Sequence, residues 1–178
     1  MAKLDIITAP DPRLKVKCRP VRRVDAEVRR LMDDMVETMH AAPGIGLAAP
    51  QVGVARRVIV VDAARQGEPR QPYRLANPEL VWVSDETACN NEGCLSLPEH
   101  YADVKRPAAI RVRYLDRDNE IRELAADGLL ATCIQHEMDH LDGVLFVDHL
   151  TALKRNIILR KLAKARKVAD PVPVAGDA

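Results

Sequence analysis

Residues 129–141 read LLATCIQHEMDHL, a helix-compatible stretch that decides how the rest of the chain is arranged. Gly143 follows it as a candidate for the left-handed glycine that ends a helix. Within the stretch, His136-Glu137-Met138-Asp139-His140 matches the pattern H-E-x-x-H. Residues four apart lie on one face of a helix, so the two imidazoles can bind one transition metal, with Glu137 close to it. We therefore predict a central helix that carries a metal site.

Two histidines do not complete a catalytic metal site, which typically has three protein ligands and one open position for water. A metzincin protease carries a further histidine where this chain has Phe146. A thermolysin-like site needs a later glutamate, and no glutamate follows Glu137. Both classes are therefore excluded, and Asp148 and His149 remain as downstream candidates for the third ligand.

Cys94 is the favoured third ligand. Cys133 lies on the helix face of the two histidines, but it is about 10 Å along the axis from His140, farther than a cysteine side chain reaches. Cys94 lies in the turn-rich segment 90–96, NNEGCLS, and a loop can bring a thiolate to the metal from outside the helix. Alone, Cys94 is more readily explained as a small buried apolar residue; the nearby histidine motif favours the ligand.

The flanking sequence predicts an α+β domain. An amphipathic helix of about four turns follows Asp25, a candidate N-cap, and ends before Pro43. Short β-branched or alternating segments indicate strands at 57–62, 73–77, 79–84, 110–115 and 121–125. A last helix covers residues 151–167. This order is typical of a mixed, largely antiparallel sheet around the H-E-x-x-H helix, in one catalytic domain over residues 1–167 with a disordered tail at 168–178.

The composition excludes several classes of protein. A chain of 178 residues buries about 70% of its unfolded surface and forms a core without disulfides. Aromatic residues make up 3% of it, too few for single-stranded nucleic-acid binding by base stacking. The N-terminus is not a secretory signal, and no apolar run approaches the roughly 18 residues of a membrane span. With only four cysteines, we expect a cytoplasmic protein with reduced thiols and no membrane or DNA partner.

A second motif, GIGLAA at 44–49, imitates a dinucleotide-binding fingerprint but lacks its context. The fingerprint follows a strand and opens a helix, whereas here a helix precedes it, and Pro50 and Gly53 interrupt the helix that should follow. Nucleotide binding is therefore disfavoured. Two interpretations stay open: a surface turn without chemistry, or an extended segment that admits another backbone and ends in Gln51, whose amide can donate to an oxyanion.

Three segments together resemble peptide deformylase: GIGLAAPQVG at 44–53, EGCLS at 92–96 and QHEMDHL at 135–141. Each motif is moderately specific alone, and the ordered triple is highly specific. The resemblance extends over about residues 3–166. The length and the C-terminal helix are similar to the bacterial type of the family that ends in a helix.

The resemblance implies three groups of site residues. The metal ligands are Cys94, His136 and His140. Glu137 is the general base and then the acid, and the Gln51 amide and the Leu95 backbone N–H stabilise the oxyanion. The substrate-binding residues are Ile45, Gly46, Gly93, Leu129 and Cys133.

The implied reaction removes the formyl group from N-formylmethionine on newly made polypeptides and releases formate. The implied cofactor is one divalent metal ion per chain, usually Fe²⁺ in the native state, with Zn²⁺, Ni²⁺ or Co²⁺ as alternatives. The substrate backbone pairs as an added strand, and its methionine enters an apolar pocket. Tyr101 stands where relatives often carry a basic residue, and Cys18 and Cys89 receive no role.

The predicted last helix is strongly basic. Residues 151–167 contain seven Lys or Arg and no acidic residue. The net charge of +1 is therefore a cancellation, because residues 1–150 hold 20 basic against 24 acidic side chains. In relatives such a helix contacts the ribosome, so we expect a ribosome contact here through phosphate groups.

Two other functions remain as alternatives to a deformylase. A metallopeptidase of another specificity would hydrolyse unblocked or acetylated peptides. A non-catalytic ribosome-binding or RNA-binding domain would hold a structural metal, and structural sites are closed by four protein ligands.

Overall fold

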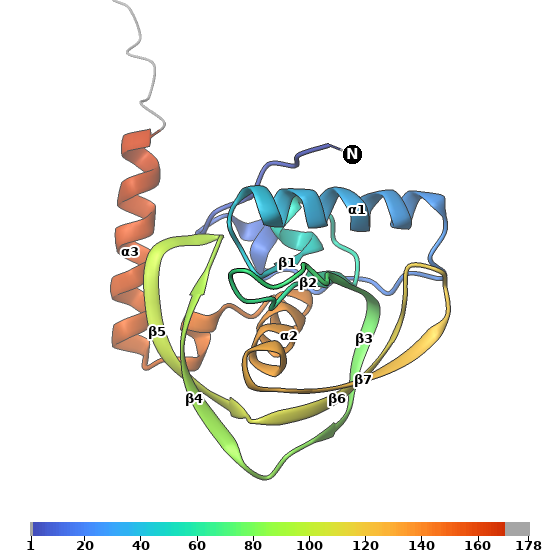
Figure 1. Cartoon of the computed structure of the whole chain (residues 1–178). Helices are drawn as coiled ribbons and strands as arrows, with labels where there is room; N and C mark the ends of the chain where they lie inside the picture. The colour runs from blue at the N-terminus through green and yellow to red at the C-terminus, as the bar shows by residue number, and fades with distance from the viewer. Residues whose placement is uncertain (1, 170–178) are drawn as a thin grey trace, which may run out of the picture.

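The computed structural model describes residues 2–169 (Figure 1). The α-helices are α1 (Ala26–Ala41), α2 (Gly128–Leu141) and α3 (Ala152–Ala169). The strands are β1 (Gly46–Ala48), β2 (Val58–Val61), β3 (Tyr73–Val83), β4 (Thr87–Cys94), β5 (Leu97–Pro107), β6 (Ala109–Leu115) and β7 (Ile121–Asp127). Short 3-10 helices are η1 (Pro12–Lys15), η2 (Ala49–Val52) and η3 (Phe146–His149).

The strands form two sheets, and every strand ladder is antiparallel. One sheet has the order β1-β2-β3-β6-β7, and the other is the hairpin β4-β5. In Figure 1 the strands curve around α2, while α1 lies across β1 and β2. The predicted α+β class with largely antiparallel strands is confirmed. In this arrangement β1 is an edge strand of one sheet and β4 is an edge strand of the other.

Helix α2 contains the whole HEMDH motif and is buried on nearly every side. Ile134 and Leu141 are fully buried and pack against strand residues such as Ile59 and Val112. A helix that is surrounded by protein buries its polar side chains as well as its apolar ones. His136 and His140 are among these buried polar side chains. Gly143 follows the helix with φ of 72°, as predicted from its position.

Helix α1 begins at a capping aspartate. The Asp25 carboxylate accepts a hydrogen bond from the Val28 N–H at 3.0 Å, which satisfies one free donor of the first turn. Met32, Met35 and Met39 are fully buried and pack on the outer face of β1 and β2. This packing holds β1, and with it the glycine-rich segment, in place.

The strands differ from the prediction in two places. Segments 73–77 and 79–84, expected as two strands, form the single strand β3, with an irregularity at Asn77, where φ is 49°. Most of segment 90–96, expected as a turn-rich loop, instead belongs to the C-terminal end of β4. Polar β4 carries no apolar alternation, so its strand character comes from pairing with β5 and not from its own residues.

Helix α3 packs on the rest of the fold through only part of its apolar surface. Leu162 is buried against a cluster that includes Leu145 and Phe146. Leu153 and Ile157 of the same helix are 71% and 43% exposed. The helix continues through Ala169, and residues 170–178 of the predicted tail lie outside the described part of the chain. None of the described helices is long and apolar enough to cross a membrane.

Candidate metal centre

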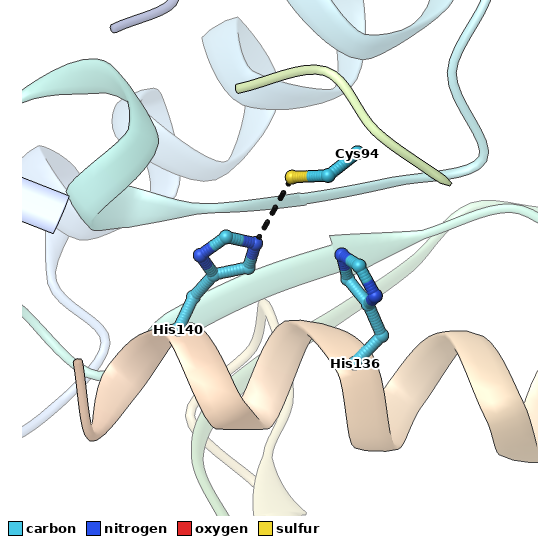
Figure 2. Close-up of side chains that lie close together, drawn as sticks. All are labelled: Cys94, His136 and His140. Carbon is cyan, nitrogen blue, oxygen red and sulfur yellow. Dashed lines mark hydrogen bonds between the residues drawn. The ribbon is translucent and has the colours of Figure 1, made fainter. Parts of the chain in front are cut away.

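The end of β4 and one face of α2 bring together three side chains that can bind a metal (Figure 2). Cys94 Sγ and one ring nitrogen from each of His136 and His140 all lie within 4.8 Å of one another. Cys94 Sγ is 3.4 Å from His140 Nε2. The strand end, rather than a loop, brings the cysteine to the helix face from outside the helix.

The two downstream candidates are engaged elsewhere. His149 Nε2 lies 2.8 Å from a carboxylate oxygen of Asp139. Asp148 accepts hydrogen bonds from Lys15 Nζ at 2.6 Å and from the Leu145 N–H at 2.8 Å. Neither side chain belongs to the three-residue cluster.

The cluster has the chemistry of a divalent transition-metal site. Two imidazole nitrogens and one thiolate suit zinc and iron, and three protein donors is the count typical of a catalytic centre. Burial lowers the pKa of His140 well below its ordinary value, so the ring is neutral, which is the form that binds a metal. The residues present therefore fit the ion that the sequence predicts.

A buried ion-pair network orients His136, and the sequence did not reveal it. Because a carboxylate can only accept, His136 Nδ1 donates to Glu92 Oε1 at 2.9 Å, leaving Nε2 for a metal. Arg106 donates to both Glu92 oxygens, at 2.7 and 2.9 Å, and to Asp139 at 2.9 Å. Burial opposes the charge on Glu92, but these hydrogen bonds outweigh it and lower the pKa of Glu92. Residues two apart in a strand lie on the same face, so predicting a strand here would have placed Glu92 on the same face as the ligand Cys94.

Glu137 is buried beside the metal cluster without a partner for one of its oxygens. Among the described residues, no hydrogen-bond donor meets Glu137 Oε2. Burial raises the pKa of Glu137 to about 7, so the carboxyl can take up and release a proton near neutral pH. The carboxylate occupies space that any side chain at position 46 would fill, and Gly46 leaves that space open.

Gln51 faces the metal cluster from η2. Its Oε1 accepts the Ala48 N–H at 2.8 Å, and its Nε2 donates to Ser96 Oγ at 3.0 Å and lies 3.5 Å from Cys94 Sγ. The residues from Leu47 through Gln51 are buried. The interpretation of this segment as a surface turn is therefore wrong, and the extended interpretation is correct for β1.

A hollow of about 410 Å³ lies between the two edge strands, over the metal cluster. Its walls include the predicted residues Ile45, Gly46, Gly93, Cys94, Leu95, His136 and Glu137. Cys133 lies beneath it, with Sγ 3.3 Å from the Ile45 carbonyl oxygen. Leu129 is in the first turn of α2, is 53% exposed and does not belong to these walls. A larger hollow, of about 1270 Å³, lies between segments 16–28 and 53–56 and has no histidine or cysteine in its walls.

Comparison with known proteins agrees with this geometry. Residues 3–156 match the family model of polypeptide deformylase. The chain is 57% identical over 169 residues to a peptide deformylase of Phenylobacterium zucineum, covering 95% of this chain and all of that protein. It is 58% identical over 171 residues to one of Methylocella silvestris, covering 94% of this chain and 87% of that protein.

A solved structure extends the comparison to the fold. The peptide deformylase of Ehrlichia chaffeensis in complex with actinonin superposes with a TM-score of 0.90 at 42% sequence identity. The match covers 94% of this chain and 99% of that one. Sequence, fold and the cluster of Cys94, His136 and His140 thus agree, and the chain belongs to the polypeptide deformylase family.

Proposed function

We propose that this chain hydrolyses the N-formyl group of formylmethionyl polypeptides and releases formate. One observation carries the proposal: a buried carboxylate with an unpartnered oxygen lines the hollow, together with Cys94 and His136 of the three-residue metal cluster. Family membership supplies the substrate class. The hollow supplies the groups that amide hydrolysis needs, which are a base, an acid and donors for the oxyanion.

Cys94, His136 and His140 hold the metal in this proposal. A divalent ion supplies Lewis-acid polarisation of the formyl carbonyl and makes water a stronger nucleophile near neutral pH. We propose Fe²⁺ as the native ion, with Zn²⁺, Ni²⁺ and Co²⁺ able to replace it. The thiolate ligand makes the site sensitive to oxidation.

Glu137 moves the proton. Its free Oε2 accepts a proton from the attacking water and returns it to the leaving amine, because amide cleavage requires a protonated nitrogen. The pKa of about 7 suits both directions of transfer. Burial beneath Gly46 keeps the carboxylate in one position and keeps competing donors away from it.

Gln51 and Leu95 stabilise the charge that develops on the formyl oxygen. Ala48 and Ser96 hold the Gln51 amide so that its Nε2 faces the cysteine ligand. Leu95 follows that ligand directly and lines the hollow, and in this proposal its backbone N–H donates to the same oxygen. Removing one such donor typically costs about 3–4 kcal/mol in the barrier.

The substrate backbone binds as an added strand between β1 and β4. Both are edge strands, and Gly46 and Gly93 present their backbones to the hollow between them. Backbone pairing of this kind recognises a peptide without regard to most of its sequence. The methionine side chain contacts Ile45 and Cys133 and extends beyond the walls of the hollow to Leu129. Burial keeps the Cys133 thiol protonated by raising its pKa, so that contact is neutral.

The direct test is formate release from a formyl-Met tripeptide by metal-loaded protein, compared with Glu137→Gln. We expect the variant to bind one metal ion per chain and to lose at least about 10²-fold in kcat. Full activity in the variant would overturn the assigned mechanism. Hydrolysis of acetylated or unblocked peptides with formyl peptides ignored would favour the metallopeptidase instead.

We also propose that α3 contacts the ribosome and that the protein acts in the cytoplasm, where polypeptides are made. Arg160, Lys161, Lys164 and Lys167 are exposed and form no ion pair among the described residues. Reversing these four charges should abolish salt-sensitive co-sedimentation with ribosomes while tripeptide hydrolysis is kept. Unchanged co-sedimentation of that variant would refute the contact.

A further inference from the structure

A second groove lies on the far side of the β4-β5 hairpin from α2, between the hairpin and α3. It has a volume of about 420 Å³. Its walls are formed by Asn91, Tyr101, Ala102, Asp103, Leu150, Lys154, Ile157 and Ile158, and we call it the α3 groove. Nothing in the proposed reaction uses it.

Tyr101 joins the α3 groove to the catalytic hollow, because its side chain lines both. Tyr101 lies opposite Gly93 in the β4-β5 ladder. A Cβ on Gly93 would be only 2.7 Å from Tyr101 Cδ1, so the ring rests on the glycine backbone. No side chain at position 93 separates the two hollows, and the 67% exposed ring forms a continuous surface from one to the other.

The α3 groove has the chemistry of a site for an extended polypeptide. Leu150 and Ile158 are half-buried and pack on the apolar cluster beneath, while Ile157 is 43% exposed above them. The two sides of the groove carry opposite charges: Asp103 of β5 is acidic, and Lys154 of α3 is basic. The Asp103 carboxylate accepts a hydrogen bond from Asn91 at 3.1 Å, and Lys154 has no ion pair among the described residues.

From this continuity we infer that the α3 groove binds the downstream residues of the formylated polypeptide. The inference rests on the proposed function, since it extends the path of the same substrate. A strand advances about 3.3 Å per residue, and Asn91 is two residues from Gly93 along β4. A chain whose second or third residue lies over Gly93 and Tyr101 therefore reaches the groove at about its fourth to sixth residue, and an apolar side chain there packs against Ile157.

The test compares three formyl-Met substrates on metal-loaded protein: a tripeptide, an octapeptide with serine at positions five and six, and one with leucine there. We expect the leucine octapeptide to have a KM about five- to tenfold lower than the other two, the effect of half burying a leucine side chain. We expect equal kcat, because contact far from the formyl group binds ground state and transition state alike. Equal KM values for the three substrates would overturn the inference.

Two exposed apolar residues of α3 provide a matched pair of variants. Ile157→Ser should erase the KM difference between the octapeptides. Leu153→Ser changes a more exposed apolar side chain of the same helix, outside the groove, and should preserve that difference. The same KM difference in both variants would contradict the assignment. So would a dimer of the wild-type chain that Ile157→Ser dissociates, because the groove would then hold a second copy.

A measurement that does not depend on turnover separates this inference from the proposed function. A leucine octapeptide with benzoylphenylalanine at position six is photo-crosslinked to metal-loaded protein and mapped by mass spectrometry. We expect attachment within 150–158, reduced by excess unlabelled leucine octapeptide. Failure to cleave any formyl peptide would refute the proposed function, whereas crosslinks that avoid both 150–158 and the opposite wall at Asn91 and 101–103 would refute the groove alone.

Discussion

The substitution Gly46→Ala places a methyl group against the Glu137 carboxylate. A Cβ at position 46 would collide with Glu137 Oε1 and lie 2.8 Å from both Glu137 Cγ and Cys133 Sγ, whereas carbon contacts are optimal near about 3.5–4 Å. Gly46 pairs with Val61 of β2, which holds the strand, so the carboxylate must move by about 1 Å. Such a displacement can cost about 10²-fold in rate, or about 2.7 kcal/mol in the barrier.

The assay is formate release from a formyl-Met tripeptide, with metal content measured on the same samples. We expect kcat/KM to fall about 100-fold while one ion per chain stays bound, because the methyl group meets the base and not the ligands. Gly44→Ala is the matched control, since its closest contacts are all atoms of the flexible Leu95 side chain, and we expect a loss below about tenfold. A Gly46→Ala protein with full metal and more than half the wild-type kcat/KM would refute the role and position given to Glu137.

Three further substitutions test the framework around the site. Arg106→Met leaves the buried Glu92 carboxylate without its partner, so urea denaturation should show about 3–5 kcal/mol less stability, partly recovered by adding Glu92→Gln. Asp25→Ala removes the N-cap of α1 and should cost about 1 kcal/mol in the same assay, whereas Asp25→Asn should cost little. The hydrogen bond from the Arg13 side chain holds the pKa of Asp11 at about 2, below its unfolded value, so Asp11 stabilises the fold above about pH 4 and that contribution is lost as pH falls through 2. The difference in urea midpoint between wild type and Asp11→Ala should therefore shrink from pH 5 to pH 2, and a constant difference would contradict the pairing.

The helices were predictable because their residues carry the signal locally. The apolar positions of α1 repeat at helical spacing and Asp25 precedes them, so its start could be placed to within one residue. The H-E-x-x-H spacing has meaning only on a helix, so α2 followed from the same motif that indicated the metal. Both elements depend on short-range patterns that a single sequence displays.

The β4-β5 hairpin was not predictable, since what stabilises it is distant in sequence. The β4 sequence TACNNEGC is polar and is typical of a turn; it forms a strand by pairing with β5, whose Arg106 also neutralises the buried Glu92. The nearby histidine motif favours Cys94 as a metal ligand, whereas nothing local in the sequence indicates that Glu92 bonds His136. The position of Tyr101 over Gly93, which joins the α3 groove to the catalytic hollow, is likewise a cross-strand effect.

The most direct test of the central claim is a titration of metal-free protein with Fe²⁺ under anaerobic conditions, with formate release from a formyl-Met tripeptide measured at each step. The account predicts activity that rises linearly to one equivalent per chain and then stays constant, and a Cys94→Ala protein that neither binds the ion tightly nor gains activity. Activity in the metal-free protein, or a Cys94→Ala protein that titrates like the wild type, would contradict a reaction centred on Cys94, His136 and His140.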